Sequence, residues 1–192
     1  MTSQSDESAQ HGAESVSKSR ALPEAGRLGR IVDKGGWLFA AGIVVAAIIL
    51  LIEVFLRYVF NSPTSWAHET TTFLCGIAFL YGGLFCAARN THVRVVLIYD
   101  ALPARLRRIF DVVISAASAV AALFFAYAAW LMVQKAVYAP SGDIRLERSG
   151  SAWNPPYPAF TKIFLLAMLI LLTAQFIVLT FNHFRRLRAK AG

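Results

Sequence analysis

Four long apolar runs separated by polar connectors set the pattern of this chain. They occupy about residues 35–58, 70–88, 112–134 and 163–184. Each run is close to the ~20 residues that a helix needs to cross a hydrocarbon layer ~30 Å thick. Strands of a membrane barrel would instead alternate apolar and polar residues over ~10 positions. The pattern therefore predicts an all-α integral membrane protein with four transmembrane helices.

The segments at the two ends of the chain are polar. Residues 1–34 are rich in Ser, Glu, Gln, Gly and Lys, and they hold too little apolar surface to offset the entropy lost on ordering. We expect residues 1–34 to form a disordered cytoplasmic tail, residues 35–185 the transmembrane domain and residues 186–192 a basic cytoplasmic tail. No small-residue cleavage pattern follows the first run, so we expect this run to be an uncleaved anchor rather than part of a signal peptide.

Charge gives the chain an orientation. Only 16% of residues are charged, whereas a soluble domain has roughly 25% charged residues. The net charge is +8. Fourteen of the 19 Lys and Arg residues lie in the N-terminal tail, the connector after the second run and the C-terminal tail. The positive-inside rule therefore predicts that both termini are cytoplasmic. Because the basic residues flank apolar runs and do not gather on one surface, we expect contact with membrane lipid and none with nucleic acid.

The connector between the first two runs holds an unusual group of polar and aromatic residues. We call residues 57–69 the hinge. Glu53 precedes Arg57 by four residues, so the two share one face of a helix and are expected to form an ion pair. An acid in an apolar run is also a functional candidate. A self-contained dimeric four-helix transporter that uses Glu53 as its coupling acid is therefore the alternative hypothesis.

Residues for catalysis or cofactor binding are not evident. The four histidines do not pair at helical spacing, as a haem or metal site in a bundle would require. There is no glycine-rich phosphate loop or nucleophile elbow. We therefore predict that the protein is not an enzyme and has no catalytic, cofactor-binding or metal-binding residues. Small residues favour close helix packing instead, namely Ser115, Ser118, Ala119, Ala122 and Gly82–Gly83.

The hinge also carries a resemblance to a known family. The segment Arg57-Tyr58-Val59-Phe60-Asn61, followed by Ser65-Trp66 and Glu69, resembles the small permease subunit (DctQ type) of tripartite ATP-independent periplasmic (TRAP) transporters. His92-Val93-Arg94-Val95 is similar to a second family signature, and Trp153-Asn154-Pro155-Pro156-Tyr157 is similar to the start of the fourth span in some branches. His68 and Val96 stand where the family commonly has acids. The candidate motif and assembly residues are Glu53, Arg57, Tyr58, Asn61, Trp66, Glu69, His92 and Arg94.

The resemblance covers about residues 35–185 and implies a function. A DctQ-type subunit is a non-catalytic membrane protein that serves as a scaffold for a large permease subunit, which carries the substrate and sodium sites. A periplasmic solute-binding protein delivers the solute, typically an organic acid. The resemblance thus implies a multi-pass protein of the bacterial inner membrane, with the large permease subunit and the binding protein as partners. It does not identify the solute.

Overall fold

The part of the chain that the structure describes folds into four long helices. The computed structural model describes residues 26–89 and 103–189. Its helices are α2 (Gly26–Val59), α3 (Trp66–Arg89), α5 (Ala104–Val137) and α6 (Tyr157–Ala189). All four are long and apolar enough to cross a membrane. The prediction of an all-α fold with four helices that are long and apolar enough to span a membrane is confirmed for the described residues.

The helices extend beyond the apolar runs that predicted them. The largest difference is at α2, which begins at Gly26 and so includes residues 26–34 that we expected in the tail. Two contacts with α3 explain the extension. Val32 is buried and its carbonyl accepts a hydrogen bond from the Tyr81 hydroxyl at 2.5 Å. Asp33 pairs with Arg89 at 2.6 Å. Tertiary contacts therefore stabilise a helical turn that hydropathy alone does not mark.

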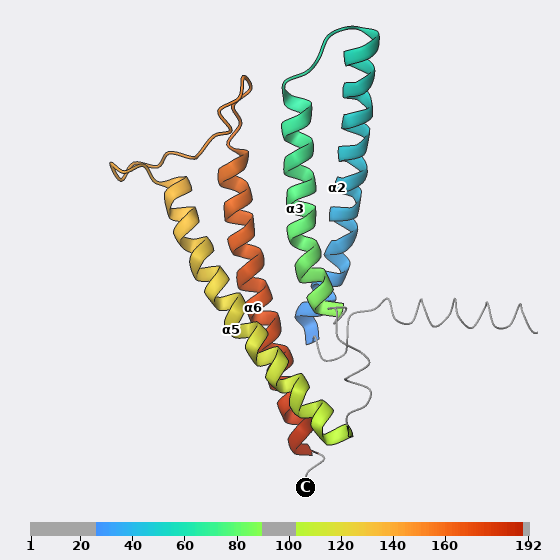
Figure 1. Ribbon diagram of the computed structural model, residues 1–192, viewed down its shortest axis with the longest axis vertical. Helices are drawn as coiled ribbons and strands as arrows, with labels where there is room; N and C mark the ends of the chain where they lie inside the picture. The colour runs from blue at the N-terminus through green and yellow to red at the C-terminus, as the bar shows by residue number, and fades with distance from the viewer. Residues whose placement is uncertain (1–25, 90–102, 190–192) are drawn as a thin grey trace, which may run out of the picture.

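The helices form two antiparallel hairpins that lie side by side. α2 packs along α3 and α5 along α6, while the inner helices α3 and α6 join the two hairpins (Figure 1). The order across the molecule is α2, α3, α6, α5, so the four helices form an open array rather than a closed bundle. The start of α2 and the end of α6 lie at the same end of the molecule (Figure 1).

Close approach within the first hairpin depends on two glycines of α2, Gly35 and Gly36. A Cβ atom at Gly35 would lie 2.1 Å from the Tyr81 hydroxyl, and one at Gly36 would lie 2.7 Å from the ring of Phe85. The Tyr81 ring also stacks on Phe39 with 3.9 Å between centroids. Gly35 and Gly36 thus let α3 side chains lie directly against the backbone of α2, as small residues commonly do between membrane helices.

The small residues predicted to mediate packing behave differently in the two hairpins. In α5, Ser115 and Ala122 are buried, and Ala119 packs against a core cluster that contains Ala122 and Phe176. The prediction is confirmed for Ser115, Ala119 and Ala122. A Cβ atom added at Gly82 or Gly83 would meet nothing within 4 Å. The close-approach role predicted for this pair is wrong, because the contact between α2 and α3 is made through glycines of α2.

The connector between α5 and α6 is an ordered loop. Arg145 and Glu147 donate backbone hydrogen bonds to the end of α5 at 2.8 and 2.7 Å. Gly142 and Gly150 adopt φ angles of +89° and +75°, which glycine reaches without steric cost. Pro103 precedes α5 as its N-cap residue.

Candidate functional site

The hinge begins where α2 ends and the chain reverses. α2 ends at Val59, and the backbone N–H of Ser62 donates to the carbonyl of Leu56 at 3.2 Å. Between them, Asn61 has a φ angle of +51°. Asn is one of the few residues with a side chain that tolerates this left-handed region, because its short side-chain amide can form hydrogen bonds with nearby groups. The motif residue Asn61 therefore has a conformational role in the turn.

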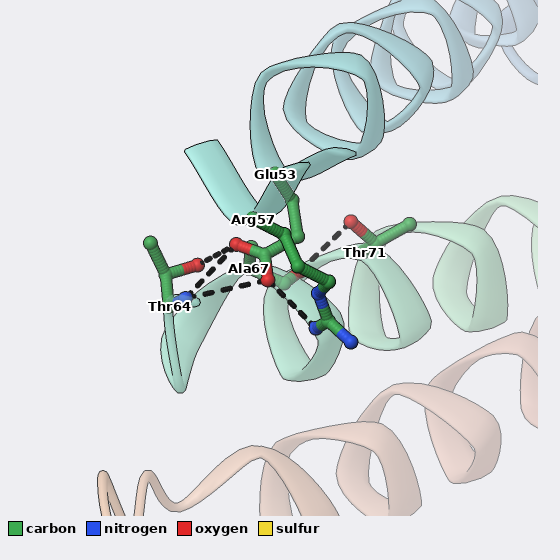
Figure 2. A network of polar contacts seen from close by, with 5 residues as sticks. All are labelled: Glu53, Arg57, Thr64, Ala67 and Thr71. Atoms are coloured by element: carbon green, nitrogen blue, oxygen red, sulfur yellow. Dashed lines mark hydrogen bonds and ion pairs between the residues drawn. The ribbon is translucent and has the colours of Figure 1, made fainter. Parts of the chain in front are cut away.

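Glu53 holds the two sides of the turn together (Figure 2). The Glu53 side chain is only 6% exposed, and its carboxylate accepts a hydrogen bond from Arg57 Nη2 at 2.8 Å. It also accepts from the backbone N–H of Thr64 at 3.1 and 3.3 Å and from the Thr64 hydroxyl. The predicted Glu53–Arg57 pair is confirmed. One carboxylate thus links the last turns of α2 to the segment that leads into α3.

The role of Thr64 was not predicted from the sequence. Thr64 lies eleven residues after Glu53, a separation that no helical spacing rule connects. The loop conformation brings the two together, and Asn61 and Pro63 precede Thr64 in that loop. The available indication was the position of a hydroxyl residue just before a helix start, where such side chains commonly bond to polar groups near helix ends.

The aromatic residues of the hinge face outward. Tyr58 is 81% exposed and Trp66 is 41% exposed. Aromatic rings with a polar edge concentrate at the boundary between hydrocarbon and water. Their exposure at this end of the first hairpin suits side chains that anchor the helices at that boundary. Arg57 is also about half exposed on its side chain, so its pairing with Glu53 leaves part of the guanidinium accessible.

The remaining motif residues are only partly accounted for by contacts. Glu69 lies in the first turn of α3, where a carboxylate is favoured by the positive end of the helix dipole. Its Oε2 atom is buried without a hydrogen-bond partner among the described residues. His92 and Arg94 lie outside the described residues. The structure therefore brings together Glu53, Arg57 and Thr64, and it places Glu69 nearby on the following helix.

The first turns of α3, which follow the hinge, contact the start of α6 in the second hairpin. The Thr70 and Tyr157 hydroxyls lie 3.4 Å apart. The rings of Phe73 and Tyr157 stack with 4.4 Å between centroids and 9° between planes. Trp153 meets Tyr157 edge-on at 5.5 Å. Tyr157, the last residue of the segment similar to the fourth-span motif of the family, therefore packs against α3, and Trp153 packs against Tyr157.

This arrangement does not favour Glu53 as the coupling acid of a self-contained transporter. The carboxylate lies near the end of α2, six residues before Val59 closes that helix, and it is engaged by Arg57 and Thr64. Coupling acids of secondary transporters lie near the middle of the membrane and face a substrate path. The geometry is that of a structural clamp for a helical hairpin.

Comparisons with known proteins agree with the motif resemblance. Residues 46–187 match the family model described as "Tripartite ATP-independent periplasmic transporters, DctQ component". The chain is 31% identical over 88 residues to the C4-dicarboxylate TRAP transporter small permease protein DctQ of Vibrio cholerae serotype O1 (strain ATCC 39315 / El Tor Inaba N16961). That alignment covers 45% of this chain and 38% of the relative. No solved structure matches the chain.

The family match and the fold together assign the chain. The matched region contains the hinge, α3, α5, the part of α2 from residue 46 onward and most of α6. The four apolar helices and the family support a multi-pass inner-membrane protein that takes part in transport. The chain belongs to the DctQ family, the small permease components of TRAP transporters.

Proposed function

We propose that this chain is the non-catalytic small membrane subunit of a TRAP-type secondary transporter and acts as a scaffold for the large permease subunit. The family match over residues 46–187 carries this proposal. The large permease subunit and a periplasmic solute-binding protein are the partners that follow from it. Both termini lie in the cytoplasm and the hinge faces the periplasm, as the distribution of basic residues predicts.

The distribution of ionisable side chains supports a scaffold role. Residues 35–52, 70–88, 112–134 and 163–182 contain no Asp, Glu, Lys, Arg or His. Secondary transporters bind their substrate and coupling ion near the membrane midplane, commonly with ionisable side chains or interrupted helices. The four helices of this chain are continuous across that region. We therefore assign the substrate and sodium sites to the large permease subunit.

The open arrangement of the helices supports assembly with a partner. α2 buries the smallest share of its apolar span, and its exposed side chains include Ile43, Ile48 and Leu51. On α5, Leu123 and Phe124 are exposed. Such outer faces suit packing against another membrane protein as well as against lipid. We propose that part of this surface contacts the large permease subunit.

The transported solute is an organic acid or a similar solute in this proposal. The Vibrio cholerae relative is named for C4-dicarboxylates, and we extend to this chain only the broader class. Uptake is driven by sodium entry into the cell, and the periplasmic binding protein delivers the solute. Specificity then depends on the binding protein and the large permease subunit.

Subunit omission in proteoliposomes tests the proposal. Uptake of radiolabelled organic acid is measured with the large permease subunit, this chain and the binding protein, under an inward sodium gradient. We expect uptake to require all three and to vanish when potassium replaces sodium. Uptake by this chain alone that is lost in Glu53→Gln would overturn the proposal and establish the self-contained transporter instead.

A further inference from the structure

A groove between α5 and α6 is separate from the hinge and lies near the opposite end of the hairpins. It has a volume of about 360 Å³, within the roughly 300–1,000 Å³ of small-molecule sites. Its lining is formed by Val112, Ala116, Ala119, Ile177, Thr180, Phe181 and Phe184. Two alanines on α5 make the groove possible, because larger side chains there would reach the α6 wall.

The groove offers no polar group to a ligand. Thr180 is the one lining residue with a polar side chain, and its hydroxyl donates to the carbonyl of Phe176 at 2.8 Å. The hydroxyl is thus satisfied within its own helix. A polar solute bound here would lose its hydrogen bonds to water without replacement. The chemistry of the lining therefore selects a hydrocarbon chain.

One end of the groove lies beside a positively charged side chain. The guanidinium of Arg185 lies 5.8 Å from the ring centroid of Phe181, a lining residue. Residues 104–112 and 184–189 together contain six arginines and one aspartate. Along α6 the lining extends from Ile177 to Phe184, a rise of ~10 Å. A short apolar groove with an arginine at one end matches a molecule with an acyl chain and an anionic head.

We propose that this groove binds an anionic phospholipid, with an acyl chain between α5 and α6 and the phosphate at Arg185. Charge argues against a second copy of the chain as the occupant. Two copies packed side by side through this groove would bring their Arg185 guanidinium groups close together, where like charges repel. A lipid phosphate instead neutralises Arg185. The proposal is independent of the scaffold function, because it concerns this chain alone.

Native mass spectrometry of the purified full-length chain tests the proposal. The protein is equilibrated with equal amounts of phosphatidylglycerol and phosphatidylcholine that carry identical acyl chains. We expect the first bound lipid to be mainly phosphatidylglycerol. Arg185→Gln should lower this preference about fivefold, the size expected for one arginine at an anionic lipid surface. Lys135→Gln removes one charge at the opposite end of α5 and should leave the preference unchanged.

Filling the groove separates specific binding from general lipid contact. Ala116→Phe should abolish retention of the first lipid, with Ala116→Leu as a milder variant should the larger one fail to fold. Ala121→Phe makes the same change at an exposed position of α5 that does not line the groove, and it should retain the lipid. Equal retention of both lipids, or unchanged binding in both Ala116 variants, would overturn the proposal. So would loss of a dimer, or of a bound large permease subunit, from the Ala116 variants without loss of lipid.

Discussion

The substitution Gly35→Ala tests how closely α2 and α3 approach. The added Cβ atom would lie 2.1 Å from the Tyr81 hydroxyl oxygen and 3.0 Å from Cζ of the same ring. The ring cannot easily move aside, because it stacks on Phe39 and its hydroxyl donates to Val32. We therefore expect the substitution to displace Tyr81 and break its hydrogen bond.

The loss of stability expected for Gly35→Ala is the sum of three contributions. Overpacking costs about 1–3 kcal/mol, and loss of the Tyr81 hydrogen bond costs about 1 kcal/mol. Replacing glycine by alanine within a helix stabilises the helix by about 1 kcal/mol. The net destabilisation is therefore about 1–3 kcal/mol, which corresponds to a fall in apparent Tm of roughly 3–8 °C for a chain of this size.

A matched control and a second-site change make the test specific. At Gly42, on the same helix, an added Cβ atom would meet nothing within 4 Å, so Gly42→Ala should leave the Tm unchanged or raise it. Tyr81→Phe removes the hydroxyl that the new methyl group would strike. In that background Gly35→Ala should cost less than in the wild type, with a coupling of about 1 kcal/mol.

Thermal unfolding in one detergent at one scan rate is the appropriate assay, because membrane proteins often unfold irreversibly and their Tm depends on the scan rate. The four proteins of the cycle are compared with Gly42→Ala. If Gly35→Ala matches Gly42→Ala, or if the two substitutions of the cycle are strictly additive, the close contact between Gly35 and Tyr81 is refuted.

Three further predictions concern the hinge. Asn61→Val should destabilise the hairpin by about 1–2 kcal/mol, because a β-branched residue resists a positive φ angle. Asn61→Gly should be tolerated, and thermal unfolding of both variants tests the difference. Thr64→Val should lower thermal stability because it removes a hydroxyl bond to Glu53, while Thr64→Ser should retain it; equal stability of the two would contradict the clamp. Arg57→Ala should lower the abundance of the subunit or of its complex before it changes the apparent solute affinity measured by uptake titration. A complex of normal abundance with altered affinity would instead show that the hinge is a docking or transport surface.

The sequence predicts the main features of the fold because apolar length and helical spacing are local properties. Four apolar runs predicted four membrane helices, and the i, i+4 spacing predicted the Glu53–Arg57 pair. The contact of Thr64 with Glu53 depends on the path of a loop, which spacing along a helix does not encode.

The glycine pair that allows close approach of α2 and α3 was also predicted wrongly from the sequence. Gly82–Gly83 and Gly35–Gly36 are equivalent as dipeptides, but only the second pair faces a neighbouring helix closely. Which glycine pair faces a neighbour depends on how each helix is rotated about its axis. Uniformly apolar membrane helices such as α2 provide little amphipathic pattern from which that rotation can be inferred.

Co-purification tests the central claim, that this chain is an assembled subunit of a transporter, most directly. The tagged chain is expressed with the large permease subunit from the same organism, extracted in mild detergent and analysed by size-exclusion chromatography with mass determination. We predict a single complex that contains both chains. Separate elution of the two chains, together with full uptake by the large permease subunit without this one, would contradict the account.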